Sequence, residues 1–314
     1  MTESGLPANT MRSRLLRAGL ALALPTMAPT VLAQTKTMST TMQKRSIPST
    51  GELLPVIGCG TYIGFDVAPG SPAYQELGGV LTPLFEAGGS VLDSSPMYGR
   101  AEQTTGELLA AAGERNKAFL ATKVWTTGKQ AGIAQINRSL SLLQSSTIDL
   151  LQIHNLQDWR TQLATLRDLK QRGVIRYIGI THYTSSAYDE VARVMKSEAI
   201  DFVQINYSLG EREAEKAILP IAADRGIAVI ANRPFGGGSL FSGLRKQPLP
   251  PWANEIGAAS WAQILLKFVL ANPALTCAIP GTAKVQYMID NVGAGMGDIP
   301  PPAFWAQPAH RIEL

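Results

Sequence analysis

Short apolar runs alternate with longer amphipathic stretches along most of the chain, from residue 56 onward. Short apolar runs are typical of buried parallel strands, and an apolar period of three to four residues is typical of helices that bury one face. The runs predict eight strands, at Val56–Thr61, Ser90–Ser94, Ala118–Val124, Ile148–His154, Tyr177–Thr181, Phe202–Asn206, Ala228–Asn232 and Cys277–Pro280. The longer stretches predict helices at Tyr74–Ala87, Ala131–Leu143, Trp159–Arg172, Ala187–Ser197, Ala214–Arg225 and Trp261–Ala271.

This alternation predicts an α/β fold, a single (β/α)8 TIM barrel, because eight strands interleaved with helices form a parallel sheet that can close on itself. A Ser-Thr-Gly segment within Ile47–Leu54 predicts a short N-terminal hairpin ahead of the barrel. A doubly wound open sheet is the alternative, and it would usually carry a Gly-rich phosphate loop after its first strand. Gly58 and Gly60 lack that spacing and do not open a helix, which favours the barrel.

The N-terminus has the pattern of a secretory leader. Residues 11–33 run from a basic start through an apolar stretch to a small-residue end, which predicts a signal peptide over residues 1–33 cleaved after Ala33. Ser13 separates Arg12 from Arg14, so the leader is at most a degenerate twin-arginine signal. Residues 34–44 are a polar linker and residues 45–314 form the barrel. We expect a periplasmic or otherwise exported protein, or a cytoplasmic one if the leader does not function.

Composition narrows the classes of partner. The 314 residues are 45% hydrophobic and carry a formal charge of only +4, without a Lys/Arg-rich run, so we expect no nucleic-acid partner. The leader is too short and too interrupted by proline to leave a stable membrane span after cleavage.

Cys59 and Cys277 lie in the first and last predicted strands, where both buried free thiols and a disulfide are open alternatives. The histidines and cysteines have no metal-ligand spacing, so no metal is expected, and the oligomeric state is not predicted.

Four polar residues stand at or just beyond three consecutive strand ends: Asp93, Tyr98, Lys123 and His154. Each has an ordinary structural explanation when taken alone, as a turn residue, a packed loop residue, a strand-end charge or a core histidine. Catalytic groups of barrels come from the carboxyl ends of different strands, which would gather these four at one mouth. A lysine inside an apolar strand also needs a carboxylate partner.

The segments that carry these residues resemble the aldo-keto reductase family. VLDSSPMYGRAE, ATKV and LQIHN are similar to its three catalytic segments in order and spacing. GCGTY, IGITHY, FVQINYS and AIPGTAKVQYMIDN extend the resemblance over about Arg45 to Asn291.

The resemblance implies reduction of a small-molecule aldehyde or ketone to an alcohol by hydride transfer from NADPH, with NADH less expected. Tyr98 would donate the proton, Lys123 would lower the pKa of Tyr98 from its ordinary value of about 10, Asp93 would hold Lys123, and His154 would polarise the carbonyl. The alternative is a nicotinamide-binding accessory or sensor protein with little turnover. The intact set of four favours catalysis.

The same resemblance implies a set of cofactor contacts. Thr181, His182 and Gln204 would face the carboxamide, and the Gly-rich loop would line the pyrophosphate. In the family an aromatic residue often stacks on the nicotinamide ring, and Asn232 replaces it here. Tyr287 replaces a family arginine near the adenosine phosphate end of the cofactor. The expected cofactor residues are Gly60, Thr61, Thr181, His182, Gln204, Asn232, Pro234, Phe235, Gly236, Gly237, Gly238, Leu240, Gly281, Thr282, Lys284, Asp290 and Asn291.

The substrate is not identified by the sequence. Phe65, Trp125, Trp159 and Tyr183 are candidates for the walls of its site. The long, proline-rich segment after Phe235, through Leu240 to Trp252, is a candidate lid over the cofactor.

Overall fold

The computed structural model describes residues 41–314. The expected signal peptide and nearly all of the linker lie outside these residues and stay predictions. Within the described part of the chain, no helix has both the length and the apolar character that a membrane span requires.

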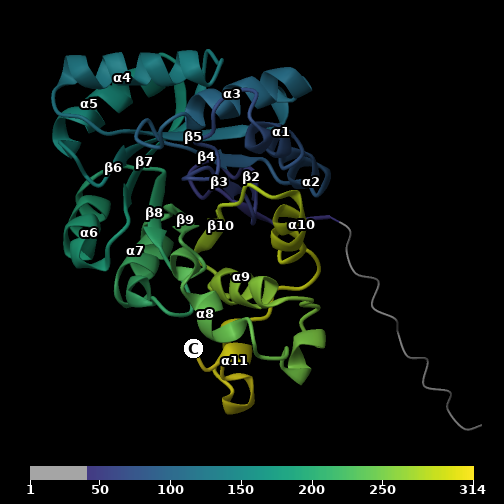
Figure 1. Cartoon of the computed structure of the whole chain (residues 1–314). Coiled ribbons are helices and arrows are strands. Elements are labelled where there is room, and N and C mark those ends of the chain that lie inside the picture. The colour runs from purple at the N-terminus through teal and green to yellow at the C-terminus, as the bar shows by residue number, and fades with distance from the viewer. Residues whose placement is uncertain (1–40) are drawn as a thin grey trace, which may run out of the picture. The chain divides into compact units, whose positions relative to one another are not determined.

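Eight parallel strands form one sheet that closes into a barrel, which confirms the predicted fold class (Figure 1). Neighbouring strands in the sheet are neighbours in sequence, in the order β10-β9-β8-β7-β6-β5-β4-β3. The two outer strands meet through bridges between Ile57 and Ala278 and between Gly60 and Gly281, so the sheet has no free edge there. The strands are β3 (Cys59–Gly60), β4 (Val91–Asp93), β5 (Phe119–Val124), β6 (Ile148–His154), β7 (Ile175–His182), β8 (Phe202–Asn206), β9 (Ala228–Asn232) and β10 (Leu275–Ala278).

Helices surround the sheet, and most lie where the apolar period predicts them. The predicted helix Tyr74–Ala87 is instead two short helices, α1 and α2, with a break at Gly79, where a Cβ would lie only 3.0 Å from Val285 Cγ2. Helix α3 was not among the predicted helices. The helices are α1 (Pro72–Gly78), α2 (Leu81–Glu86), α3 (Ala101–Ala112), α4 (Lys129–Leu142), α5 (Trp159–Gln171), α6 (Tyr188–Ser197), α7 (Ile218–Arg225), α8 (Leu240–Leu244), α9 (Trp261–Ala271), α10 (Val285–Gly293) and α11 (Pro302–Trp305).

The interior of the barrel is filled by side chains from alternate positions of its strands. Phe119, Leu150, Tyr177 and Phe202 belong to this filling, and the three aromatic rings lie within 6.2 Å of one another, centroid to centroid. Cys277 belongs to this cluster, and both Cys277 and Cys59 are buried free thiols. A second, larger cluster fills the space between the strands and the helices. The interior is therefore a packed core and not a channel.

A hairpin closes the amino-terminal end of the barrel, as predicted. Its strands, β1 (Lys44–Ser46) and β2 (Leu53–Pro55), are antiparallel, and Ile47 and Leu54 join the interior cluster. The Arg45 guanidinium donates to the carbonyl oxygens of Leu270 (2.5 Å), Asn272 (2.9 Å) and Leu275. These carbonyls lie at the end of α9 and the start of β10, so the hairpin also caps a helix.

The segment expected to act as a lid is anchored at its far end. Trp252 is buried in a separate cluster with Ile256 and Ile264, against Phe304 and Trp305. The Trp252 ring lies 5.7 Å from the Phe304 ring and 5.8 Å from the Trp305 ring, centroid to centroid. The segment that follows the Gly-rich loop is therefore held against the C-terminal part of the chain.

Replacing Arg45 by alanine should lower the free energy of unfolding by about 2–4 kcal/mol, because three carbonyl groups lose a charged donor. Urea unfolding followed by circular dichroism measures this. Lys44→Ala removes an exposed cation from the same strand and should leave the midpoint nearly unchanged. Equal midpoints for the two variants would contradict the capping role.

Candidate active site

The polar site begins where the apolar filling of the barrel ends. Side chains of a strand point alternately inward and outward, so Phe119, Ala121 and Lys123 of β5 share the inward face. Along this row the residues change from apolar at the closed end to a lysine at the open end. The open, carboxyl-terminal end of the barrel therefore carries the charged and polar groups.

A buried ion pair occupies the centre of this end. The Lys123 ammonium donates to Asp93 Oδ2 and to the Ser94 carbonyl oxygen, both at 2.7 Å, and both side chains of the pair are almost fully buried. Burial alone would lower the pKa of Lys123, but Asp93 and Tyr98 together raise it above its ordinary value. The ammonium therefore stays charged inside the barrel.

Two glutamines complete the shell around Asp93. Gln152 Nε2 donates to Asp93 Oδ1 at 3.1 Å, and Gln204 Nε2 donates to the same atom at 2.8 Å. The Thr181 hydroxyl donates to Gln204 Oε1 at 3.4 Å. The sequence predicted that Gln204 and Thr181 face a cofactor carboxamide. In the structure the Gln204 amide nitrogen donates to Asp93 and its oxygen accepts from Thr181.

Tyr98 lies over the ion pair. It follows β4 in a tight turn, in which its backbone N–H donates to the Ser95 carbonyl oxygen at 3.0 Å. The Lys123 ammonium lies 5.0 Å from the centroid of the Tyr98 ring, and the centroid of the Tyr62 ring also lies 5.0 Å from that of Tyr98. Lys123 lowers the pKa of Tyr98, but burial raises it more, so the net shift is upward. This net direction is opposite to the one expected from the sequence, and it keeps the phenol protonated.

His154 ends β6 beside Tyr98, with ring centroids 6.2 Å apart and nearly perpendicular. Its Nδ1 is 3.2 Å from the Ser95 hydroxyl. Burial and the nearby Lys123 charge lower the pKa of His154 to about 3, so the ring is neutral at physiological pH. If Ser95 donates to Nδ1, the proton of the neutral ring is on Nε2, where it can be donated to a ligand.

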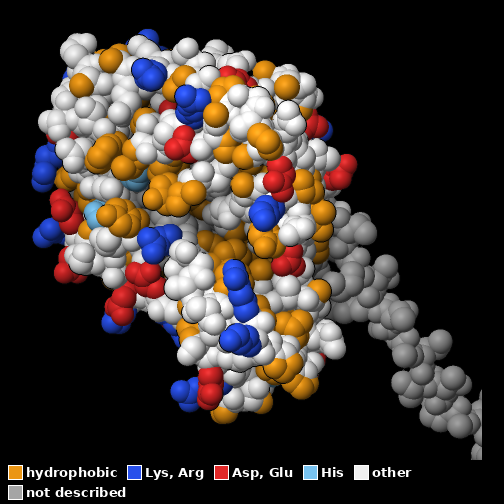
Figure 2. All heavy atoms as spheres, in the orientation of Figure 1, with side chains coloured by type: hydrophobic (Ala, Val, Ile, Leu, Met, Phe, Trp, Pro, Cys, Tyr) orange, Lys and Arg blue, Asp and Glu red, His pale blue; other side chains and the backbone are white. Residues whose placement is uncertain are grey.

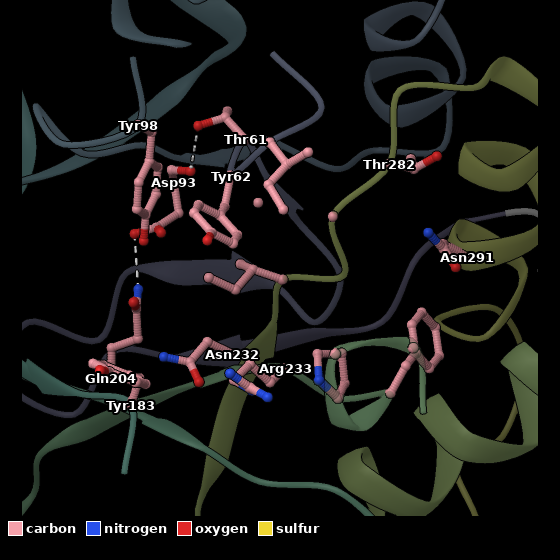
Figure 3. Close-up of a pocket in the computed structure, with 18 of the residues that line it drawn as sticks. Thr61, Tyr62, Asp93, Tyr98, Tyr183, Gln204, Asn232, Arg233, Thr282 and Asn291 are labelled. Carbon is pink, nitrogen blue, oxygen red and sulfur yellow. Dashed lines mark hydrogen bonds between the residues drawn. The ribbon is translucent and has the colours of Figure 1, made fainter. Parts of the chain in front are cut away.

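One large cavity, of about 970 Å³, opens over this site. Figure 2 shows the face on which hydrophobic side chains gather around a hollow, and Figure 3 shows residues from opposite ends of the cavity. The predicted site residues that line it are Gly60, Thr61, Asp93, Tyr98, His154, Thr181, Gln204, Asn232, Pro234, Phe235, Gly237, Gly238, Gly281, Thr282, Asp290 and Asn291.

Other predicted residues do not line the cavity. Lys123 lies beneath it in the ion pair. The ring of His182 turns to Thr184, where Nδ1 lies 3.2 Å from the backbone N and 3.1 Å from the hydroxyl. Gly236 and Leu240, the first residue of α8, are not among the lining residues, and Lys284 places its ammonium 5.9 Å from the centroid of the Tyr287 ring. Of the candidate substrate walls, Trp125 and Tyr183 line the cavity, whereas Phe65 is buried and Trp159 does not reach it.

The family model for the aldo/keto reductase family matches residues 56–300. The chain belongs to the aldo/keto reductase family. Its eight-stranded parallel barrel is the fold of this family, and the members of the family are NAD(P)H-dependent oxidoreductases.

Named relatives support the assignment. The chain is similar to the methylglyoxal reductase YeaE of Escherichia coli, with 30% identity over 262 residues that cover 80% of this chain and 89% of the relative. It is also similar to the aldo-keto reductase YhdN of Bacillus subtilis, with 29% identity over 65% of this chain and 63% of that protein.

Two solved structures of Klebsiella pneumoniae aldo-keto reductases are similar in fold. One, in complex with NADPH, has a TM-score of 0.68 at 27% identity and covers 81% of this chain and 90% of its own. The other, in complex with NADP and acetate, has a TM-score of 0.67 at 26% identity and covers 78% of this chain and 87% of its own.

The cavity of this aldo/keto reductase is also lined by residues that the sequence gives no reason to single out. Most of them come from the loops after the strands, from α8 and the residue after it, and from the starts of α9 and α10. They are Tyr62, Ile63, Met97, Asn155, Arg233, Phe241, Arg245, Ser260, Trp261, Ala262, Ile279 and Tyr287.

Because the pKa of His154 is lower in the folded than in the unfolded protein, its contribution to stability is complete above about pH 6.5 and is lost as the pH falls towards 3. Over pH 6 to 4, the wild type should lose about 1.4 kcal/mol of unfolding free energy per pH unit more than His154→Gln does. Urea unfolding at a series of pH values measures both slopes. Parallel slopes would show that the folded protein accepts a proton on His154.

Proposed function

We propose that this aldo/keto reductase reduces an aldehyde or ketone to the alcohol with NADPH as the electron donor and Tyr98 as the proton donor. The observation that carries the proposal is a protonated phenol beside a buried ammonium, at the floor of a cavity large enough for a dinucleotide and a small carbonyl compound. The nicotinamide cofactor found in both Klebsiella pneumoniae relatives supports the choice of donor.

The residues around the cavity fit a nicotinamide dinucleotide. The side-chain oxygens of Asn155 and Asn232 are buried without a hydrogen-bond partner among residues 41–314, and both residues line the cavity. Buried acceptors of this kind suit an amide donor such as a carboxamide. The Gly-rich loop, with Gly237 and Gly238 at positive φ, would hold the pyrophosphate, and Thr282 and Asn291 would hold the adenosine end.

When bound, the reduced nicotinamide supplies a hydride to the carbonyl carbon. The carbonyl oxygen then gains negative charge and needs a proton, which the Tyr98 hydroxyl donates. The O–H bond of Tyr98 breaks as the O–H bond of the alcohol forms, and a phenolate remains. The Lys123 ammonium stabilises that phenolate, and Asp93 holds Lys123 in position.

His154 would orient and polarise the carbonyl. Its neutral ring can donate from Nε2 to the carbonyl oxygen while Ser95 occupies Nδ1. A neutral ring does not compete with Tyr98 as a proton source, because its imidazolium form is disfavoured by the adjacent ammonium. The two groups therefore have separate roles: His154 positions the oxygen and Tyr98 protonates it.

Tyr98→Phe should lower kcat/KM by about 100-fold or more, because the general acid is lost while the cavity keeps its shape. Loss of NADPH absorbance with an aldehyde panel measures the rate, and titration calorimetry measures NADPH binding, which should be retained. Undiminished turnover by Tyr98→Phe would contradict the assignment of Tyr98 as the proton donor. Tight NADPH binding by the wild type without turnover of any carbonyl would instead favour an accessory or sensor protein.

The substrate end of the cavity is apolar and carries no free charge among the described residues. Tyr62, Ile63, Met97, Trp125 and Tyr183 are exposed large apolar side chains that line it. The nearest ionic groups, Asp93 and Lys123, neutralise each other, and His154 is neutral. A carboxylate on the substrate would lose its hydration here without gaining a partner. We therefore expect an uncharged carbonyl compound; methylglyoxal, in the name of the Escherichia coli relative, is also uncharged.

The methyl ester of 4-carboxybenzaldehyde should be reduced with a kcat/KM about ten-fold higher than the free acid, because only the acid brings an unpaired charge. The two compounds share the ring and the aldehyde, so the comparison isolates the charge. NADPH-coupled rates at saturating cofactor measure it. Equal or faster reduction of the acid would contradict an uncharged substrate.

A further inference from the structure

A second cavity, the α11 pocket, lies apart from the active site. Its lining includes Arg212, Phe268, Trp305 and Arg311, and its volume is about 480 Å³. It shares no lining residue with the cavity over Tyr98. Its walls come from the segment after β8, from α9, and from α11 with the segment that follows it. Figure 1 shows α11 below α8 and α9, far from β4 and β5. The volume is within the range of about 300–1,000 Å³ that is typical of small-molecule sites.

Two aromatic side chains line the α11 pocket. The rings of Phe268 on α9 and Trp305 on α11 meet nearly edge to face, with their centroids 5.5 Å apart. The Trp305 ring also packs on that of Trp252, at 5.8 Å and nearly perpendicular, so it is held from a second side. Rings fixed in this way give the flat ring of a ligand a surface to pack on.

The indole N–H of Trp305 lacks an acceptor. Its Nε1 is buried and has no hydrogen-bond partner among residues 41–314. A buried donor left in this state costs about 1–3 kcal/mol, and folded proteins contain few of them. Because Trp305 lines the α11 pocket, a ligand bound there can supply the missing acceptor.

The charge of the α11 pocket favours an anion. Arg212 and Arg311 line it, and none of the described residues that line it has an acidic side chain. Arg212 is already engaged, because its Nε and Nη2 donate to the two carboxylate oxygens of Glu215, both at 2.8 Å. Arg311 is exposed and forms no ion pair with any of residues 41–314. Its planar guanidinium is therefore available to the two oxygens of a carboxylate.

We propose that the α11 pocket binds a small aromatic carboxylate. The ring of the ligand packs against Phe268 and Trp305, and its carboxylate accepts from the Trp305 indole N–H and from the Arg311 guanidinium. An inorganic anion would leave the aromatic rings uncovered, and an uncharged ring would leave Arg311 unpaired. Binding there does not depend on the proposed function, because the α11 pocket and the active site have no lining residue in common.

The test follows the indole N–H signals of the five tryptophans by ¹H–¹⁵N NMR while 3-phenylpropanoate is added to the whole protein. Trp125 and Trp261 line the active-site cavity, so their signals report binding there, and the Trp305 signal reports binding in the α11 pocket. Each of these three signals is assigned by its loss in the corresponding Trp→Phe variant.

Two analogues and two variants separate the contributions to binding. The compound 3-phenylpropanamide lacks the charge, and 3-cyclohexylpropanoate lacks the aromatic ring. Arg311→Gln removes the proposed partner of the carboxylate. Arg193→Gln is the matched control, because it removes an exposed arginine of α6 that lines neither cavity. Urea midpoints check that both variants are folded.

The Trp305 signal should shift downfield and saturate with 3-phenylpropanoate, because the indole N–H gains a charged acceptor, while the Trp125 and Trp261 signals stay in place. Arg311→Gln and the amide should each raise the Kd by about ten-fold, the effect of one charge-assisted contact. The cyclohexyl acid should bind at least about two-fold more weakly than the phenyl acid. Arg193→Gln should match the wild type.

A Trp305 signal that stays in place up to the solubility limit of 3-phenylpropanoate would overturn the proposal. Shifts of Trp125 and Trp261 without Trp305 would assign the acid to the active site and would overturn it equally. If the acid and the amide bind alike, or if Arg311→Gln matches Arg193→Gln, the carboxylate is not what the α11 pocket recognises.

Discussion

The charge of Lys123 inside the barrel is the constraint on which the rest of the site depends. An ammonium without water is tolerated only when it is paired and fully hydrogen-bonded, and here Asp93 and the Ser94 carbonyl oxygen meet that need at 2.7 Å. Asp93 is in turn held by Gln152 and Gln204, so groups from β4, β5, β6 and β8 converge on one carboxylate. Any slip in strand register would leave a buried charge unpaired. The hydrogen bonds of Asp93 and Lys123 that fix the strand register also set the electrostatics of Tyr98. The fold and the proposed chemistry therefore depend on the same contacts.

Much of the barrel could be predicted from the sequence, because its strands are short, mostly apolar and almost entirely buried. The strands at Ile148–His154, Phe202–Asn206 and Ala228–Asn232 have the predicted bounds. Helix α3 gave no such signal, since it buries polar residues: Glu102 accepts from Thr122 at 2.6 Å, and Gly106 packs directly on the backbone at Leu142. An apolar period cannot reveal a helix whose inward face is made of such residues.

The residues of the candidate site were also predictable only where a strand positions them, and not where a loop does. Asp93, Lys123 and His154 could be found because each lies at the end of a strand or one residue before it, where position along the chain determines position in the barrel. Arg233 and the turn of His182 towards Thr184 could not, because both depend on loop geometry. The net direction of the Tyr98 pKa shift could not be predicted from the sequence either, because it is the balance between the burial of Tyr98 and the Lys123 charge.

The aromatic cluster around Trp252 connects the C-terminal segment to one wall of the cavity. Trp252 packs on Phe304, Trp305 and His310, and the chain between it and α8 carries Arg245 and Gln247 along the cavity wall. The barrel strands take no part in this support. Substitutions in this cluster would therefore reach the cavity wall at Arg245 without altering the strands that hold Asp93 and Lys123.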